Sequence, residues 1–357
     1  MAFYGYRLFS FRIAPGPSGR TPRNLKDCQG EPYLEVALRA MKALSQDTMI
    51  GDPPSKPEEV AITAGAAALA LGVNYANEPA FRVEELQVVE NTIRATVMSG
   101  KFGSHGKALS AEGPSADADI SDMAPAKSFR LVLALPRDGK TGILAVEDIS
   151  RSTPVTPLTK WLFWRSQQEV EEYRAQGETG RLAWRPMVKP LTDEERLIKL
   201  VREGKAHALE LVKHSISAAS TRPQKRYKVL APVLDENMAE RVVGVLKGWM
   251  ETSASEDELT GEMAKPVITD AQAAKQLAAI VGPEILDLNP DEGYVVLQED
   301  DESSKTRKIS PTQMSDIFTY GQPGGQKSDT PKFYGQVRKT AMRLQAAANI
   351  AVDWPEQ

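Results

Sequence analysis

The sequence predicts an α+β protein of two domains, in which antiparallel sheets pack against helices. Strand-like segments dominate the first half of the 357-residue chain, and the second half mixes helices and strands. Apolar residues make up 41% and charged residues 26%, as in soluble globular proteins, and the length suffices for two cores. We expect a β-rich α+β domain over 1–190, and a mixed α+β domain with basic clusters and a long C-terminal helix over 191–357.

Periodicity predicts the elements of the first domain. FYGYRLFSFRI alternates with period two, which predicts a strand over 3–13. EPYLEVALRAMKALS places its leucines on one helical face over 31–45. The remaining predictions are an apolar stretch over 60–75, a strand over 81–97, a loop over 101–126, strands over 128–135, 142–149 and 181–188, and a helix over 159–175.

The second domain begins with a predicted capping box at Thr192–Glu195, which opens a helix to about Glu203. Gly204 breaks that pattern, so AHALELVKHSI is predicted to be a strand. The later predictions are a strand over 226–233, helices over 236–252 and 270–281, a strand over 293–298, a short helix over 310–318 and a final helix over 330–350.

The residue counts limit the possible chemistry. One cysteine, Cys28, excludes an internal disulfide framework and makes a reducing cytoplasm the expected location. Three histidines and one cysteine leave a Cys/His metal site short of ligands, and we expect no metal and no cofactor. No run approaches the ~20 apolar residues of a membrane span, and the N-terminus lacks the pattern of a signal peptide.

ALPRDGKT, residues 134–141, fits the loose form of a phosphate-binding loop. Such a loop needs a helix directly after it, whose N-terminus holds the phosphates. Here a β-branched segment follows, and we expect Pro154 and Pro157 to exclude a helix across the stretch that comes next. Both flanks are strand-like, so we interpret Asp138-Gly139 as the two-residue turn of a hairpin.

Other catalytic patterns are weak. His207 and His214 are seven apart, a spacing that metal pairs do not use. The stretch NPDEGYVVLQEDD lacks the closing lysine of a nuclease carboxylate motif. No nucleophile elbow or dinucleotide fingerprint is present. We expect a protein that is not an enzyme and has no catalytic residues.

Charge is unevenly distributed along the chain. Residues 185–230 hold 11 Lys/Arg and 5 Asp/Glu, a net +6. Residues 251–302 hold 2 and 14, a net −12, and residues 303–345 hold 8 and 2, again +6. Two basic segments therefore flank an acidic one, an arrangement that the overall charge of −4 conceals.

The basic clusters STRPQKRYK, SSKTRKIS and KFYGQVRKTAMRL favour phosphate binding through charge and counterion release. They come without a helix-turn-helix, zinc-finger or RNA-recognition signature, so base-specific contacts are not expected. The predicted DNA-binding residues are Lys205, Lys213, Arg222, Lys225, Arg226, Lys228, Lys305, Arg307, Lys308, Lys332, Arg338, Lys339 and Arg343.

The order of segments resembles a known family. The relevant stretches are the aromatic strand FYGYRLF, then GILAVEDISRSTPVTPLTKWL, then RLAWRPMVKPLTDEERLIKLVREGKAHALELV, followed by the long C-terminal helix. This order is similar to the RexA-like phage-exclusion proteins, whose fold in turn resembles the RdgC family of ring-forming DNA-binding proteins. The likeness covers most of the chain but includes no invariant motif, and 101–126 and 251–265 stand as insertions.

The resemblance implies a cytoplasmic homodimer that binds double-stranded DNA without sequence preference. It also implies a prophage-encoded sensor of an anti-phage exclusion system, with a membrane-protein partner encoded nearby and no catalytic residue. Two other hypotheses stay open. One is a metal-dependent nuclease of a defence system with scattered carboxylates. The other is a protein-binding adaptor, in which the acidic segment 251–302 binds a basic partner or masks the protein's own basic surface.

Overall fold

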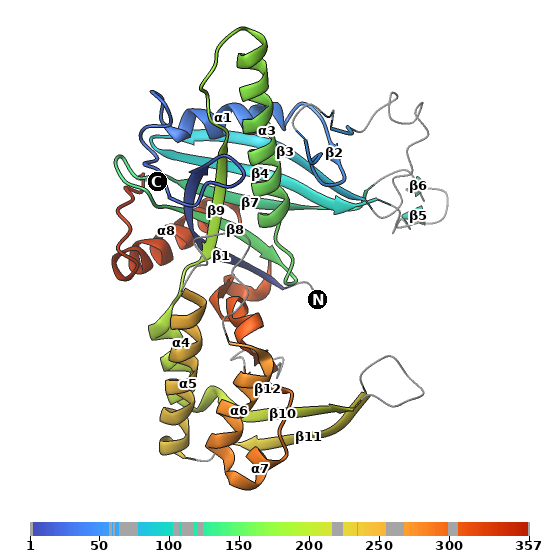
Figure 1. Ribbon diagram of the computed structural model, residues 1–357, viewed down its shortest axis with the longest axis vertical. Coiled ribbons are helices and arrows are strands. Elements are labelled where there is room, and N and C mark those ends of the chain that lie inside the picture. The colour runs from blue at the N-terminus through green and yellow to red at the C-terminus, as the bar shows by residue number, and fades with distance from the viewer. Residues whose placement is uncertain are drawn as a thin grey trace. The chain divides into compact units, whose positions relative to one another are not determined.

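The computed structural model describes residues 3–56, 59, 61–63, 78–102, 107–108, 118–119, 124–215, 224–233, 235–254, 268–298 and 306–355 (Figure 1). Contacts between Cα atoms divide the chain into two compact units. Unit 1 comprises Met1–Leu191 together with Thr319–Gln357, and unit 2 comprises Thr192–Phe318. Helices accompany antiparallel sheets, which confirms the predicted α+β class with antiparallel sheets.

An eight-stranded antiparallel sheet forms the centre of unit 1, in the order β14-β1-β8-β7-β4-β3-β2, with β9 also paired to β1. The strands are β1 (Tyr4–Pro15), β2 (Met49–Ile50), β3 (Pro79–Val89), β4 (Thr92–Lys101), β7 (Ala126–Ala134), β8 (Gly142–Ile149), β9 (Trp184–Pro190) and β14 (Thr319–Gly321). A separate two-stranded ladder joins β5 (Lys107–Ala108) and β6 (Ala118–Asp119). The strand predicted over 3–13 is confirmed as β1, which pairs with β8, β9 and β14.

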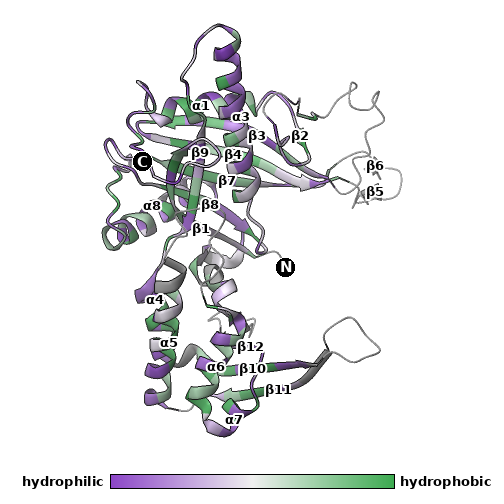
Figure 2. Cartoon of the chain, viewed as in Figure 1, coloured by the Kyte–Doolittle hydropathy of each residue, from purple (hydrophilic) through white to green (hydrophobic). Residues whose placement is uncertain are grey.

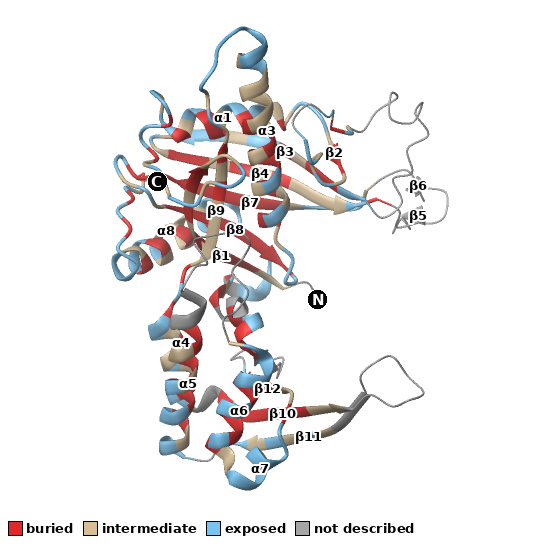
Figure 3. Ribbon diagram, in the orientation of Figure 1, coloured by how far each residue is buried: buried red, intermediate tan, exposed pale blue. Residues whose placement is uncertain are grey.

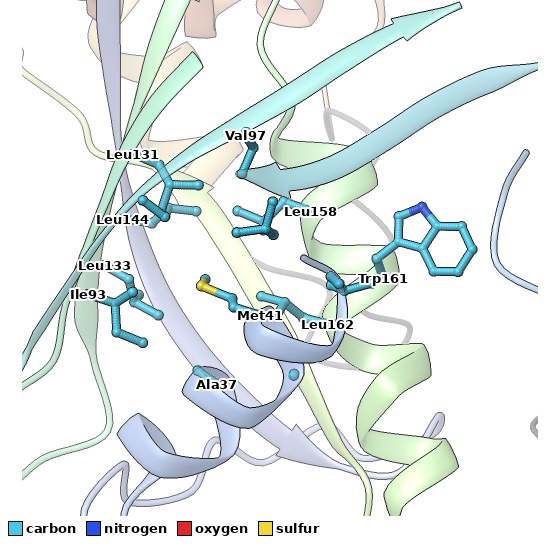
Figure 4. Packing of buried hydrophobic residues seen from close by; sticks show 14 of the residues in the cluster. Ala37, Met41, Ile93, Val97, Leu131, Leu133, Leu144, Leu158, Trp161 and Leu162 are labelled. Atoms are coloured by element: carbon cyan, nitrogen blue, oxygen red, sulfur yellow. The ribbon is translucent and has the colours of Figure 1, made fainter. Parts of the chain in front are cut away.

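Helices α1 (Tyr33–Ala43) and α3 (Val155–Ala175) cover one face of this sheet. Met41 of α1 and Leu158 of α3 meet Leu131 and Leu144 of the strands in the largest core of the unit (Figure 4). Every residue of β8 is buried, because elements cover both faces of the sheet at this strand (Figure 3). That burial explains the apolar runs Leu131–Ala134 in β7 and Gly142–Val146 in β8, whereas β3 alternates with polar residues (Figure 2).

Helix α8 (Thr330–Ala347) covers the opposite face of the same sheet. Its residues Phe333, Val337 and Ala341 are fully buried against Leu8 and Val132 of the strands. By its contacts the C-terminal segment therefore belongs to unit 1, which differs from the predicted grouping of residues 191–357 in one domain. The apolar face of α8 packs against residues that lie more than 300 positions earlier, in the case of Leu8, and about 200 positions earlier, in the case of Val132, and local sequence does not specify this pairing.

Unit 2 contains a four-stranded antiparallel sheet in the order β11-β10-β12-β13. Its strands are β10 (Ala206–Ser215), β11 (Gln224–Pro232), β12 (Glu292–Gln298) and β13 (Thr306–Ile309). Its helices are α4 (Glu194–Leu200) with a π-helical turn at Val201–Lys205, α5 (Glu236–Ala254), α6 (Asp270–Val281) and α7 (Pro283–Asp287). Leu209 and Leu211 of β10 pack with Leu246 and Trp249 of α5 and with Leu277 of α6, so the helices cover one face of the sheet.

The remaining irregular elements are two 3-10 helices, Pro311–Phe318 and Pro323–Gly325. The first confirms the short helix predicted over 310–318. Helix α6 begins at Asp270 as predicted, because Thr269 and Gln272 form a reciprocal capping box. Most of the apolar stretch 60–75 and of the loop 101–126 lies outside the described residues.

Three predicted boundaries are wrong. The strand predicted over 81–97 is a hairpin of β3 and β4, which turns at Glu90 with a positive φ of 52°. Helix α3 begins at Val155 and not at residue 159, so Pro157 lies in its first turn. Proline is tolerated there because the N–H groups of the first turn have no partner within the helix. The cap of α4 is Asp193 in place of Thr192, since the Asp193 carboxylate accepts from the N–H of Arg196.

The segment ALPRDGKT connects the antiparallel strands β7 and β8, which confirms the predicted hairpin. The connection is longer than a two-residue turn, because it runs from Leu135 to Thr141. Gly139 adopts a φ of 140°, and the Asn24 side chain donates to the Asp138 carboxylate at 2.7 Å. A strand and not a helix follows this loop, so the geometry of a phosphate-binding loop is absent at this position.

Among the described residues, no helix is both long and apolar enough to cross a membrane.

Candidate nucleic-acid interface

Helix α8 is amphipathic, and its exposed face is basic. Phe333, Val337, Ala341 and Leu344 point into the core of unit 1. Their spacing of four and three residues puts them on one side of the helix. The exposed residues of the helix include Lys332, Lys339 and Arg343. These three predicted residues therefore share the solvent face of α8.

No acidic residue interrupts this basic face. Helix α8 contains neither aspartate nor glutamate in its 18 residues. In the part of the chain that the structure describes, no carboxylate forms an ion pair with Lys332 or Lys339. The described residues therefore place no carboxylate within ion-pair distance of either ammonium group.

A buried ionic network fixes the segment that leads into α8. The Arg130 guanidinium donates to Glu147 Oε1 at 2.5 Å and to the Ser328 carbonyl at 2.7 Å. Arg130 and Glu147 are 4% and 0% exposed, and the Arg130 guanidinium also stacks over the Phe333 ring at 4.4 Å from its centroid. Removing one partner from such a pair leaves an uncompensated buried charge, so the network ties α8 to β7 and β8.

Further side chains complete this network. Gln322 donates to Glu147 Oε1 at 3.3 Å and accepts from the N–H of Ser328 at 2.9 Å. Lys327 lies 3.6 Å from the other Glu147 oxygen. Asp329 then caps α8 by accepting from the N–H of Lys332 at 2.8 Å. The basic face of α8 is therefore held in a fixed orientation on the sheet of unit 1.

In unit 2, two of the predicted basic clusters meet at one buried carboxylate. Lys228 of β11 lies 3.0 Å from Glu210 Oε2, and Lys308 of β13 lies 2.6 Å from Glu210 Oε1. Glu210 is 2% exposed, and the Lys308 ammonium also lies 5.5 Å from the centre of the Tyr294 ring. We name this group, Glu210 with Lys228, Lys308 and Tyr294, the Glu210 face. It brings together residues that are 80 positions apart in the sequence.

The lysines keep Glu210 ionised. Burial alone would raise the pKa of this carboxyl, but hydrogen bonds from Lys308 and Lys228 outweigh burial and lower the pKa below its usual value. In return, Glu210 offsets one of the two lysine charges, so the three groups together carry +1. The Glu210 face is therefore less positive than the sequence of its strands indicates.

Lys213 is also compensated. Its ammonium donates to Asp291 Oδ1 at 2.7 Å and to the Asn289 carbonyl at 2.8 Å. The hydrogen bond from Lys213, with another from the N–H of His214, lowers the pKa of Asp291. Lys213 therefore serves to hold β10 against the start of β12, and little of its charge faces outward.

The other predicted residues divide into two groups. Arg338 is half-buried on the flank of α8 and does not share its solvent face. Arg222 and Lys305 lie outside the described residues, and of Lys205, Lys225, Arg226 and Arg307 only the backbone is described. The structure thus places Lys332, Lys339 and Arg343 together on α8, and Lys228 and Lys308 together around Glu210.

The described residues contain no group of three or more His, Cys, Asp or Glu side chains that could hold a metal ion. Cys28 is buried, and burial with the charges of Glu31 and Asp27 raises the pKa of its thiol to about 12. The thiol is therefore uncharged at neutral pH and a poor nucleophile.

Two buried ionic groups, Glu210 and the pair Arg130–Glu147, were not predicted, although the sequence carries a signal for each. Glu210 is the one charge between apolar neighbours in AHALELV, which indicates a partnered buried carboxylate. In the β7–β8 hairpin Leu131 pairs with Val146. The next positions along the two strands are Arg130 and Glu147, so opposite charges lie on neighbouring strands at the same level. Their partners from residues 308, 322 and 328 could not be found from local sequence.

No protein-family model, curated protein or solved structure matches this chain.

Proposed function

We propose that this protein binds double-stranded DNA without sequence preference and that the exposed face of α8 is a principal contact surface. The single observation that carries the proposal is the row of cations Lys332, Lys339 and Arg343 on a helix face without acidic residues. A surface of this kind attracts phosphates by charge and by release of counterions.

The spacing of the row suits a phosphate backbone. A rise of 1.5 Å per residue separates Lys332 from Lys339 by about 10 Å along the helix and Lys339 from Arg343 by about 6 Å. Phosphates recur about every 3.4 Å of axis along each DNA strand, so a row of this length meets several of them. Contacts of this type position a protein on DNA and carry no sequence information.

The Glu210 face is a secondary contact surface in this proposal. Lys228 and Lys308 are both 42% exposed, so their ammonium groups remain accessible while they bind Glu210. Because Glu210 offsets one charge, each lysine of this face attracts DNA phosphates less strongly than each cation of α8 does.

The wider role in the proposal is that of a cytoplasmic, homodimeric sensor in an anti-phage exclusion system, which acts by binding and not by catalysis. The order of sequence segments that resembles the RexA-like proteins supports this role. A membrane protein encoded beside the gene is the expected partner. Such a neighbour gene would strengthen the proposal.

The test is a titration of a fluorescent duplex with the full chain at several salt concentrations. The triple variant K332Q/K339Q/R343Q should bind more weakly, and its slope of log affinity against log salt should fall by about 2 to 3, because each lost phosphate contact removes about 0.9. Duplexes of different sequence should lose affinity equally.

A matched control removes the same charge elsewhere. Lys26, Lys42 and Lys275 are exposed and lie outside α8. For the variant K26Q/K42Q/K275Q, the slope of log affinity against log salt should differ from that of the wild type by less than about 0.9, the contribution of one phosphate contact. Equal slopes for the wild type and the α8 triple variant would reject α8 as the contact surface, and absence of duplex binding at low salt would reject the proposed function.

A further inference from the structure

A small cavity lies between α8, strand β4 and the C-terminal residues of unit 1. Its volume is about 250 Å³ with its opening to solvent included. Only about 10 Å³ of that space admits the centre of a water-sized sphere, so the enclosed part suits at most one compact group. The lining residues are Thr92, Arg94, Val132, Tyr334, Arg338, Trp354 and Pro355.

Two hydrogen-bond donors that line the cavity are buried without a partner among the residues that the structure describes. Thr92 is 1% exposed, and its hydroxyl forms no hydrogen bond. The Nε of Arg338 is also buried and forms none. Buried polar groups in folded proteins are nearly always paired, so two unpaired donors in one cavity indicate a missing acceptor.

Arg94 supplies further donors at the same cavity. Its guanidinium carbon lies 4.8 Å from the centre of the Tyr334 ring. Stacking of this kind uses the face of the guanidinium and leaves its N–H groups, which lie in the plane, free to bind an acceptor. Within the described part of the chain, Arg94 forms no ion pair.

Among the residues that the structure describes, no carboxylate lines the cavity. Glu147, whose charge acts on Tyr334, binds Arg130, and Glu85 accepts a hydrogen bond from the Thr96 hydroxyl at 3.2 Å. The described lining residues therefore include two arginines and no carboxylate, so the charge that they contribute to the cavity is positive.

We propose that this cavity is a binding site for a single phosphate group, held by the guanidinium groups of Arg94 and Arg338 and by the hydroxyl of Thr92. A phosphate has enough oxygens to accept from two guanidinium groups and a hydroxyl at once, whereas a carboxylate has two. Arginine also matches phosphate with paired N–H donors. The group comes either from a free phosphate ion or from the end or backbone of a polynucleotide, which present the same chemistry.

Titration calorimetry with inorganic phosphate, against chloride at equal ionic strength, tests this site. Wild-type protein should bind one phosphate per chain with a Kd of about 1 mM or tighter. R338Q should bind at least tenfold more weakly. The control is K42Q, because Lys42 is exposed, lies outside the cavity and belongs to neither proposed contact surface. K42Q should bind phosphate like the wild type, and equal binding by R338Q would overturn the proposal.

The variant T92V separates a ligand-binding role from a structural one. It replaces the unpaired hydroxyl by a methyl group of the same shape, so the phosphate-free protein should melt at a higher temperature. The same variant should gain less thermal stability than the wild type from added phosphate. An equal gain in the two proteins would show that the hydroxyl does not bind phosphate and would overturn its assigned role.

The site does not depend on the proposed DNA-binding function, and the two can be tested apart. K332Q/K339Q/R343Q should lose DNA affinity and keep phosphate binding, whereas R338Q should lose phosphate binding. Competition by a 5′-phosphorylated oligonucleotide but not by its 5′-hydroxyl form would assign the site to a DNA end. Competition by both oligonucleotides would assign the site to the DNA backbone. If neither oligonucleotide competes, the ligand is free phosphate.

Discussion

The lysines of the solvent face of α8 and of the Glu210 face all come from the two basic segments, 185–230 and 303–345, but carboxylates surround them differently. On α8, Lys332 and Lys339 have no acidic partner among the described residues. On the Glu210 face, Lys228 and Lys308 share one buried carboxylate. Charge counted along a sequence therefore overestimates the field of a surface wherever the fold brings an acid to it from another strand.

The two surfaces also differ in what orients them. The Arg130–Glu147 network lies beneath α8, on the buried side, and leaves the exposed cations untouched. On the Glu210 face the ion pairs involve the exposed lysines themselves. On α8 the groups that stabilise the structure are therefore different from the exposed cations, whereas on the Glu210 face they are the same groups. Three measurements test this difference.

The largest effect should come from Arg130→Met. It leaves Glu147 buried without its main partner, and the free energy of unfolding should fall by about 3–5 kcal/mol in a urea titration. The control is Arg137→Met, because Arg137 forms a pair with Asp353 in which both side chains are exposed, and its loss should cost at most about 1 kcal/mol. A similar cost for both variants would contradict the role of the buried network.

The second variant, Glu210→Gln, should lower the free energy of unfolding at pH 7 by about 1.5–3 kcal/mol, as expected for hydrogen bonds to a charged group. The folded state lowers the pKa of Glu210, so its stabilisation is complete above the usual value of 4.5 and is lost as the pH falls below it. The wild type and the variant should therefore converge in stability at acidic pH. A difference that stays constant from pH 7 to pH 3 would reject this assignment.

The smallest effect should be that of Glu210→Gln on DNA binding. Removing the acid frees one positive charge, so duplex affinity at low salt should rise by roughly threefold, the contribution of about one phosphate contact. Lys228→Gln should change affinity in the opposite direction. Weaker binding by Glu210→Gln would show that the carboxylate's positioning of the lysines matters more than its charge.

Local sequence predicted the elements whose signals are local. The predicted helix over 270–281 has the bounds of α6, and alternation correctly predicted β1. Local sequence did not separate two strands that lie in one apolar run. The β3–β4 hairpin was predicted as a single strand, because its turn at Glu90 contains no glycine. Local sequence also failed at the start of α3, where proline suits the first turn.

The candidate sites were only partly predictable. Sequence identified Lys332, Lys339 and Arg343 as one basic group, because helical periodicity places them on one face. It did not predict Thr92 and Arg94 as part of a cavity with Arg338, since these residues are more than 240 positions apart. Their proximity follows from the packing of α8 against β4 and β7.

By itself the sequence determined the α+β class, the hairpin at ALPRDGKT and the amphipathic pattern of α8, because these depend on neighbouring residues. Only the tertiary structure decided that α8 packs on unit 1, that Glu210 offsets the charge of Lys228 and Lys308, and that Thr92, Arg94 and Arg338 surround one cavity. The physical reason is that burial and charge compensation depend on which distant segments meet, and the hydrophobic effect that joins them is not directional.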